Sequence, residues 1–380
     1  MTAHHRVRAV ALLCGLGPAA FGLAACQEEG PTRLVEPSRA ESAAEVGGTA
    51  ALVKAAKKEG RLNTIALPRQ WANYGALIDG FEKKYGIKVV VDNPNGHSQQ
   101  EIDAVKRYRG RPRAPDVLDL GDSFAQSAAR QKLLAPYRVA QFDQIPPEQK
   151  DAEARWYNNY GGYVSIGCDA ARVRTCPASF ADLLQPAYKG LVSIDGDPTI
   201  AGAAFAAVYA AALANGGSFD DIQPGIDFFA RLAKVGNYNR VTPSPVTIAK
   251  GTTPISIEWD YLSLQHLDQL RGTGVNWKVS IPFDGSFSQY YAQAITKDAP
   301  HPAAARLWEE YLFRPESQNL RLVDYARPVL LAVMAKNGTL NKALAARLPT
   351  VEGTPQFPTA AQLNKALHTV GENWAKAVGG

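Results

Sequence analysis

Short hydrophobic segments of strand length alternate with amphipathic helical segments along most of this chain. "LNTIAL" precedes "YGALIDGFEKKYG", "IKVVV" precedes "SQQEIDAVKRY", and "PDVLDL" precedes "SFAQSAARQKLL". Such alternation is typical of a mainly parallel sheet with helices on both faces. Because 380 residues exceed what one ordinary core holds, the pattern predicts an α/β protein built from two lobes.

A second series repeats this organisation further along the chain. "LVSID" precedes the small-residue segment "TIAGAAFAAVYAAALANGG", which we expect to pack closely between its neighbours, and "PISIEW" leads into "YLSLQHLDQL". Gly60 and Gly86 are placed to end helices. Ser98, followed three residues later by Glu101, predicts a capping box at a helix start.

The N-terminus has the pattern of an export signal. The basic segment "MTAHHRVR" is followed by "AVALLCGLGPAAFGLAA", which Gly and Pro interrupt too often for a membrane span. Leu23-Ala24-Ala25-Cys26 resembles the lipobox of bacterial lipoproteins. We expect residues 1–25 to be a lipoprotein signal peptide, Cys26 to carry lipid and 26–48 to be a flexible tether. A buried hydrophobic helix or a non-lipidated secretory signal are the alternatives.

Two cysteines remain after Cys14 and Cys26, and they lie close together in "GCDAARVRTCP". In an exported protein, Cys168 and Cys176 favour a disulfide, with two buried thiols as the alternative. No His or Cys stands at metal-ligand spacing around them, so zinc is not expected.

The chain carries one basic run, "KRYRGRPR", and a formal net charge of +5. We interpret the run as a solvated loop, in preference to a nucleic-acid-binding patch. No nucleic-acid partner is therefore expected.

Polar and aromatic side chains gather in the loops that follow the predicted strands. In open α/β sheets, ligands bind beyond the carboxyl ends of the strands. The loops in question are "PRQWANY", "NPNGHSQQ", "GDSF", "GDPTIAG" and "EWDY".

Several longer segments resemble solute-binding proteins of ABC importers, in the group that serves ferric iron, polyamines, thiamine or aminoethylphosphonate. The resemblance is carried in order over about residues 50–335 by "LVKAAKKEGRL", "FEKKYGIKV", "PDVLDLGDSFAQSAARQKLLAPY", "PASFADLLQPAYKGLVSI" and "AITKDAPHPAAARLWEEYLFRPESQ". It implies the type II periplasmic-binding fold, with two crossing hinge strands near residues 158–167 and 287–296.

The resemblance also implies a domain organisation and a function. Lobe 1 would begin with residues 49–160, lobe 2 would span 161–288, and 289–380 would hold the second hinge strand, the rest of lobe 1 and C-terminal helices. The chain would capture a small polar solute by lobe closure and deliver it to an ABC permease. No catalysis, cofactor or metal is expected. We expect a monomer on the outer face of the cell membrane or in the periplasm.

The solute hypothesis depends on "EWDY". Ferric-binding relatives carry two adjacent tyrosines in the corresponding loop, whereas this chain has Asp260-Tyr261. Tyr290-Tyr291 is a tyrosine pair, but it falls on the second crossing strand. These differences weaken the hypothesis of a ferric iron ligand. They do not exclude it, since a hard cation accepts carboxylate and phenolate oxygens as ligands.

Acidic and aromatic side chains at the strand ends favour an amine. Carboxylates at the ends of a slot with rings between them suit a di-cation such as a polyamine. Arg69, Arg327 and the helix N-termini favour a phosphonate, phosphate or carboxylate instead, and an aminophosphonate could use both kinds of group. The candidate ligand-binding residues are Arg69, Trp71, Tyr74, Ser98, Asp122, Ser123, Asp197, Glu258, Asp260, Tyr261, Tyr290 and Arg327.

Simpler roles stay open for some of these residues. Asp122 and Asp260 are also placed to cap helices, and Trp259 is more typical of a core residue. Which of Tyr290 and Tyr291 faces the cleft is open.

A hydrolase is the remote alternative. Gly121-Asp122-Ser123 with "DAPH" resembles GDS-type esterases, with Ser123 as nucleophile, His301 as base and Asp298 as its orienting partner. A purely structural or adhesion lipoprotein is a third possibility.

Overall fold

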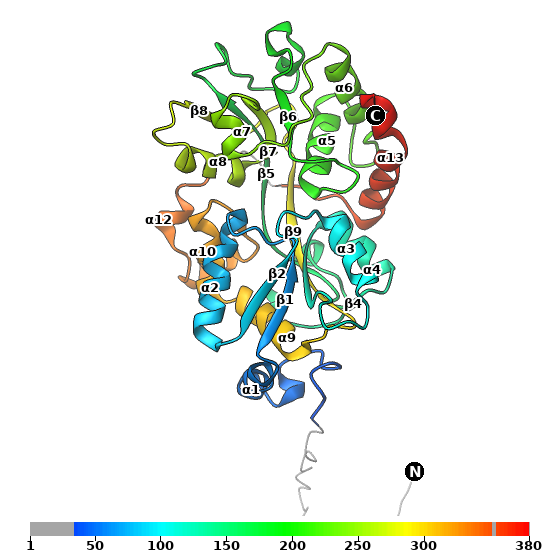
Figure 1. Cartoon of the computed structure of the whole chain (residues 1–380), viewed down its shortest axis with the longest axis vertical. Helices are drawn as coiled ribbons and strands as arrows, with labels where there is room; N and C mark the ends of the chain where they lie inside the picture. Colours follow the sequence, from blue (N-terminus) through cyan, green and yellow to red (C-terminus); the bar gives the residue numbers. More distant parts are fainter. Residues whose placement is uncertain (1–33, 352–354, 380) are drawn as a thin grey trace, which may run out of the picture. The chain divides into compact units, whose positions relative to one another are not determined.

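The computed structural model describes residues 34–351 and 355–379. The predicted signal peptide and Cys26 lie outside the described residues. From Leu34 onward the chain forms one compact unit. Two long strands, β5 (Tyr157–Asp169) and β9 (Ser288–Thr296), pair antiparallel through its middle (Figure 1). These are the two crossing hinge strands, and they connect a group of elements at each end.

Lobe 1 holds two sets of strands and the helices that cover them. β1 and β2 pair in parallel, whereas β3 and β4 both pair antiparallel with β9. The strands are β1 (Arg61–Ile65), β2 (Lys88–Asp92), β3 (Val117–Gly121) and β4 (Leu134–Ala135). The helices are α1 (Thr49–Glu59), α2 (Tyr74–Tyr85), α3 (Ser98–Arg107), α4 (Asp122–Arg130) and α9 (Pro302–Leu312).

Lobe 2 is built around β5 and the strands beside it. β7 pairs antiparallel with β5 and in parallel with β6, and β8 also pairs with β5. The strands are β6 (Val192–Ile194), β7 (Ile255–Trp259) and β8 (Trp277–Ser280). The helices are α5 (Gly202–Ala214), α6 (Gln223–Lys234), α7 (Pro245–Ala249) and α8 (Asp260–Gln269).

The prediction of mainly parallel sheets is wrong for most strand pairs, because only β1/β2 and β6/β7 pair in parallel among the described residues. The other ladders are antiparallel because β5 and β9 run in opposite directions between the lobes and their neighbours align against them.

The C-terminal region contacts both lobes. It contains α10 (Pro315–Val323), β10 (Arg327–Pro328), α11 (Leu331–Asn337), α12 (Lys342–Ala345) and α13 (Ala360–Val378). α13 packs on α6 of lobe 2, where the ring of Trp374 lies 5.3 Å from that of Phe229, and Leu367 packs against the core beneath α4 of lobe 1.

Residues 34–48 differ from the tether expected there. Ala40 is fully buried, and the Arg306 guanidinium donates hydrogen bonds to the carbonyl oxygens of Ala40 and Ser38. These contacts fasten the segment to α9, so it forms part of the folded unit.

The helix start at Ser98 also differs from expectation. His97 is the N-cap, and its backbone N–H donates to the side chain of Gln100. Ser98 and Glu101 instead accept hydrogen bonds from the backbone N–H groups of Gly121 and Asp119 on β3. The predicted capping box is therefore wrong by one residue, and the two side chains hold the end of β3.

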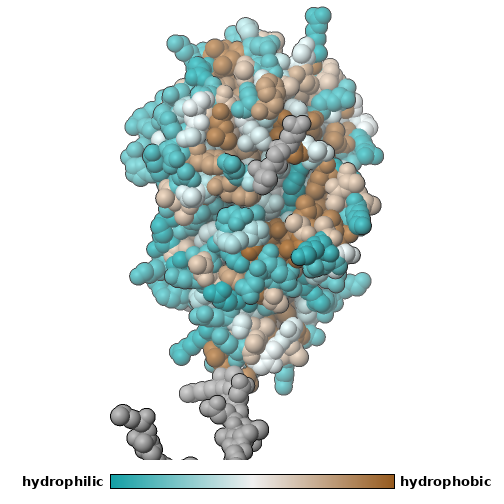
Figure 2. Space-filling model, turned by 180° about the vertical axis from the view of Figure 1, so that it is seen from behind, coloured by the Kyte–Doolittle hydropathy of each residue, from teal (hydrophilic) through white to brown (hydrophobic). Residues whose placement is uncertain are grey.

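The surface carries few large exposed hydrophobic side chains among the described residues. Figure 2 shows hydrophobic patches interspersed with hydrophilic residues on one face, with hydrophilic residues dominating the lower part of the view. No helix in residues 34–351 or 355–379 combines the length and hydrophobicity needed to cross a bilayer.

Close packing of α5 against α6 gives a test of the fold. The interior-facing residues of α5 are mostly alanines, and a Cβ on Gly225 of α6 would clash with the carbonyl oxygen of Val208. We expect Gly225→Ala to lower the free energy of unfolding by about 1–3 kcal/mol through overpacking, measured by urea denaturation. Gly371 of α13 has open space around a Cβ, so Gly371→Ala should be neutral or stabilise by up to about 1 kcal/mol. Equal effects of the two substitutions would contradict this packing.

Candidate functional site

A cavity of about 370 Å³ lies between the two lobes beside the crossing strands. This volume is at the lower end of the range of about 300–1,000 Å³ that is usual for small-molecule sites. Lobe 1 contributes Trp71, Glu101 and Asp119, lobe 2 contributes Asp195, Thr242 and Ser244, and β9 contributes Tyr291.

The lobes touch at the rim of the cavity. The backbone N–H of Gln99 in α3 donates to the carbonyl oxygen of Ile200, 3.2 Å away in lobe 2. Gly121 and Gly202 abut so closely that a Cβ on Gly202 would lie 3.2 Å from the Gly121 Cα. The structure is thus a closed arrangement, with the cavity held between the lobes.

Asp195 is the carboxylate in the cavity that has no partner. It follows the last residue of β6, and among the described residues none forms a hydrogen bond or ion pair with its side chain. Burial raises the pKa of Asp195 to about 7, and the Glu258 carboxylate adds to the shift. An ionised Asp195 would therefore gain from a positive charge placed in the cavity.

Asp119 and Glu101 form the lobe 1 wall and are hydrogen-bonded. Asp119 accepts a hydrogen bond from the Tyr160 hydroxyl at 2.6 Å and another from the Gln293 amide. Burial raises the pKa of Asp119 to about 6 and that of Glu101 well above its ordinary range. The Arg321 guanidinium partly opposes the shift at Asp119.

Aromatic rings complete the wall near the hinge. The Trp71 indole N–H donates to the Tyr160 hydroxyl at 2.7 Å, and the Tyr291 ring stacks on the Tyr160 ring with centroids 5.7 Å apart. The Arg321 guanidinium lies 4.1 Å from the ring centroids of both Tyr74 and Tyr160. This hydrogen-bonded stack fixes the two rings that face the cavity, Trp71 and Tyr291.

The electrostatic character of the cavity is acidic. Of the described residues that line it, none is Arg or Lys, whereas three are acidic, namely Glu101, Asp119 and Asp195. His97 also lines it, and burial lowers the pKa of that imidazole despite the nearby Asp197. The described residues contain no group of three or more His, Cys, Asp or Glu side chains arranged to hold a metal ion.

Two of the residues predicted from the sequence line the cavity, and one supports it. Trp71 and Ser98 face it directly. The Tyr74 hydroxyl accepts a hydrogen bond from Gln293, the residue that also donates to Asp119. Tyr74 therefore lies behind the wall.

Asp260 and Arg327 bind each other away from the cavity lining. They form a buried ion pair, and Asp260 also accepts a hydrogen bond from the Tyr163 backbone N–H at 3.0 Å. Arg327 donates in addition to the Pro349 carbonyl oxygen. Asp260 is the first residue of α8, the N-cap is Trp259, and no side chain caps this helix start. The pair fastens the start of α8 to β5 and β10.

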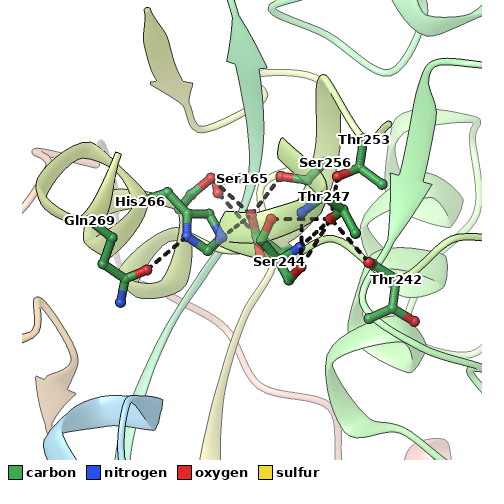
Figure 3. Close-up of polar contacts among 10 residues, drawn as sticks. Ser165, Thr242, Ser244, Thr247, Thr253, Ser256, His266 and Gln269 are labelled. Atoms are coloured by element: carbon green, nitrogen blue, oxygen red, sulfur yellow. Dashed lines mark hydrogen bonds and ion pairs between the residues drawn. The ribbon is translucent and has the colours of Figure 1, made fainter. Parts of the chain in front are cut away.

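Glu258 belongs to a buried polar network inside lobe 2, of which Figure 3 labels Ser256 and His266. It accepts hydrogen bonds from the hydroxyls of Ser256 and Ser263, and His266 Nε2 lies 3.4 Å from it. Burial lowers the pKa of His266, but Glu258, Gln269 and Asp195 together outweigh burial and raise that pKa. Figure 3 also shows Ser244, which lines the cavity, hydrogen-bonded to Thr247 in the cap of α7.

Three other predicted residues lie outside the cavity lining. Arg69 is exposed and pairs with Asp79 at 2.6 Å. Asp122 is buried, accepts a hydrogen bond from Gln126 and has its pKa raised to about 7 by burial. Asp197 is exposed and accepts from the Thr199 backbone N–H.

The tyrosines differ in the directions they face. Tyr261 is buried, with its ring 6.3 Å from that of Trp259, which is itself a core residue. The Tyr290 ring lies 5.9 Å from Phe357, whereas Tyr291 lines the cavity.

The structure does not assemble a hydrolase triad from the described residues. Ser123 is buried at the start of α4. His301 Nδ1 lies 2.8 Å from Asp116, and Asp298 pairs with Arg109. The imidazole and carboxylate that the GDS-type hypothesis needs are thus engaged elsewhere.

Sequence reasoning missed Asp195, Asp119 and Glu101, and it left the choice between Tyr290 and Tyr291 open. Asp195 is the last residue of the predicted strand "LVSID". The end of a strand lies at the edge of the sheet where ligands bind, and this position was the signal for Asp195. Asp119 lies between Leu118 and Leu120 in a buried strand, and a carboxylate there was itself a signal. Cys168 and Cys176 form a disulfide in the structure.

The lobes, the crossing strands and the cavity between them define a two-lobe binding protein. The family of bacterial extracellular solute-binding proteins matches residues 113–350, and the chain belongs to this family. It is a solute-binding protein of the ABC-importer class, as the sequence resemblance predicted. No curated protein matches the chain in sequence.

Solved structures share the fold at low sequence identity. AfuA from Actinobacillus pleuropneumoniae, with fructose-6-phosphate bound, is 19% identical with a TM-score of 0.66, covering 82% of this chain and 98% of its own. AgtB from A. tumefacien R10, in complex with agropinic acid, is 17% identical with a TM-score of 0.67, and the match covers 84% of this chain and 99% of AgtB. Iron-bound HitA from Pseudomonas aeruginosa is 18% identical with a TM-score of 0.61, and the match covers 84% of this chain and 99% of HitA. The type II periplasmic-binding fold is thereby confirmed.

The two arginines predicted to meet the ligand allow a matched test. Arg327→Met would leave Asp260 as an unpaired buried carboxylate, so we expect a loss of about 3–5 kcal/mol in the free energy of unfolding. Arg69→Met removes an exposed ion pair and should cost less than about 1 kcal/mol. Urea denaturation of both variants measures the difference, and a cost below 1 kcal/mol for Arg327→Met would contradict the role assigned to the buried pair.

Proposed function

We propose that this chain captures a small cationic amine, such as a diamine or polyamine, in the interlobe cavity for an ABC permease. One observation carries the proposal: three carboxyl side chains line the cavity, and its described lining contains no Arg or Lys and one imidazole, His97, whose pKa burial lowers. A cation is the ligand that offsets the negative charge of such a set of acids when they are ionised.

The individual groups in the cavity suit an ammonium ion. Asp195 has no partner among the described residues and is available for an ion pair. Trp71 and Tyr291 present rings that attract a cation through their faces. Thr242 and Ser244 add hydroxyls as hydrogen-bond acceptors.

A zwitterionic amine with a phosphonate or carboxylate group is the second candidate. Ser98 and Gly202, the first residues of α3 and α5, both line the cavity, and the backbone N–H groups of helix N-termini favour an anion. Arg69 and Arg327 give this candidate no support, since both pair with carboxylates outside the cavity lining.

Ferric iron is the weaker alternative. The hypothesis that the chain binds ferric iron relies on Asp260 and Tyr261 as ligands, and neither residue lines the cavity. The solved structures of similar fold hold a sugar phosphate, agropinic acid or iron. At 17–19% identity they share the fold and do not select among solutes.

The remaining parts of the proposal follow from the sequence. Cys26 carries lipid and anchors the chain to the outer face of the membrane, and the chain acts as a monomer. It performs no chemistry on its solute, because affinity and lobe closure suffice for delivery.

Asp195 and Asp197 provide the test. Putrescine, spermidine, aminoethylphosphonate and ferric citrate are first compared by thermal shift, and the best solute is then titrated calorimetrically. We expect an amine to bind and Asp195→Asn to weaken it about 10- to 100-fold, the usual range for one charge-assisted contact. Asp197→Asn, two residues away and exposed, should change affinity less than about threefold. Ferric citrate as the tightest ligand, or unchanged affinity in Asp195→Asn, would overturn the proposal.

The pH dependence of affinity follows from the raised pKa values. The solute's positive charge favours ionised carboxylates, whereas free Asp195 and Asp119 have pKa values of about 7 and 6. Below these values a proton must leave before the cation binds, so affinity should fall as pH drops from 8 to 5.5. We expect a loss of about 30-fold if Asp195 alone must ionise and about 100-fold if Asp119 must ionise as well, with proton release on binding measured calorimetrically in two buffers. Asp195→Asn should flatten the profile, and a flat wild-type profile would contradict a cation held by these carboxylates.

A further inference from the structure

The exposed charges of one segment in lobe 1 are all positive. Residues 105–139 contain eight basic side chains, all exposed, and three acidic ones, Asp116, Asp119 and Asp122, all buried. The basic residues are Lys106, Arg107, Arg109, Arg111, Arg113, Arg130, Lys132 and Arg138. The run "KRYRGRPR", which solute binding leaves without a role, is part of this segment.

Two adjoining hollows collect basic side chains from this segment and from elsewhere in the fold. A hollow of about 320 Å³ is lined by Lys106, Arg109, Lys132 and Lys297. A second hollow, of about 490 Å³, shares Lys132 and Lys297 and adds Arg39, Arg155 and the buried Arg306; its one further acid, Glu153, pairs with Arg155. We call the two together the basic face. Its lysines come from α3, the end of α4 and the turn after β9, so folding brings them together.

Three ammonium groups of the basic face have no partner in the described residues. Lys106, Lys132 and Lys297 form no side-chain hydrogen bond or ion pair there, whereas Asp298 in the same hollows is already paired with Arg109 at 2.8 Å. Lys132 also adopts φ 58°, a left-handed conformation that glycine would hold with less strain. Lysine thus stands at a position where backbone geometry favours glycine.

The start of the described chain lies at the same face. Ser38 and Arg39 line the second hollow, and Arg306 holds this segment through its hydrogen bond to Ala40. Cys26 precedes Leu34 by eight residues, which reach at most about 29 Å when fully extended. A chain anchored at Cys26 therefore cannot carry Leu34 far from the membrane surface.

We propose that the basic face of lobe 1 binds the phosphate groups of anionic lipids on the membrane to which the chain is anchored. It rests on the proposed function only through the anchor at Cys26. Each basic side chain near an anionic membrane gives about a fivefold gain in affinity, and the attraction fades beyond a Debye length of about 10 Å at 0.1 M salt.

Vesicle binding of the full chain carrying Cys26→Ser tests the face without the lipid anchor. We expect binding to vesicles of 30% phosphatidylglycerol in phosphatidylcholine, little binding to pure phosphatidylcholine, and loss of binding at 0.5 M salt. Adding Lys106→Glu, Lys132→Glu and Lys297→Glu together should weaken binding at least about 30-fold.

A matched control variant carries three Lys→Glu substitutions in lobe 2, so its net charge changes as much as that of the lobe 1 variant. Lys189→Glu, Lys234→Glu and Lys250→Glu, all exposed there, should weaken vesicle binding less than about threefold. Equal losses in both triple variants would show a general charge effect and overturn the proposal. Absence of binding to anionic vesicles, or binding only to vesicles that contain the permease, would overturn it too.

Two further measurements keep the outcomes separate. Thermal unfolding and solute titration of each variant check that folding and the cavity are intact, and Lys106→Ala with Lys297→Ala avoids the strained position 132. Vesicle binding that fails while solute binding persists refutes the basic face alone. Solute binding that fails in the wild type refutes the proposed function without touching the vesicle result.

Discussion

The antiparallel pairing of β5 with β9 is the constraint on which the binding site depends. It sets Tyr160 opposite Tyr291 and Gly161 opposite Tyr290. Gly161 and Gly162 are required there, because a Cβ on either would clash with Tyr290 or with the Asp260 carboxylate. A shift of one residue would turn Tyr291 away from the cavity and separate Asp119 from its partners Tyr160 and Gln293.

The fold was predictable from the sequence because its signals are local. Strand and helix periods, with Gly60 and Gly86 at helix ends, indicate the elements, the length of the chain indicates two lobes, and the resemblance to solute-binding proteins implies the type II fold. The site was less accessible, since it depends on which face of a strand meets the cavity. Asp195 and Asp197 flank one turn at the same strand end, yet only Asp195 lines the cavity. The sequence alone could not distinguish Tyr290 from Tyr291 for the same reason.

Long-range pairing was the second obstacle. Asp260 and Arg327 are separated by 67 residues and were both assigned to the ligand, on opposite arguments about its charge. In the structure each neutralises the other. A buried acid or base predicts a charged partner but does not say whether that partner is a residue or a solute. The same ambiguity did not arise for Asp195, which has no partner among the described residues.

That unpaired carboxylate links charge to closure. When the lobes meet, Asp195 loses water and gains no hydrogen bond or ion pair from the described residues. The attraction of His266 offsets only part of this loss, so closing an empty cavity costs desolvation or requires a proton. A bound ammonium ion offsets this cost only in the closed form, where Asp119, Glu101 and the rings of Trp71 and Tyr291 surround it. A solute can shift the open–closed equilibrium only by its difference in affinity for the two forms. If the solute is the proposed amine, an acidic cavity whose described lining contains no Arg or Lys makes positive charge the property of the solute that the permease can sense through closure.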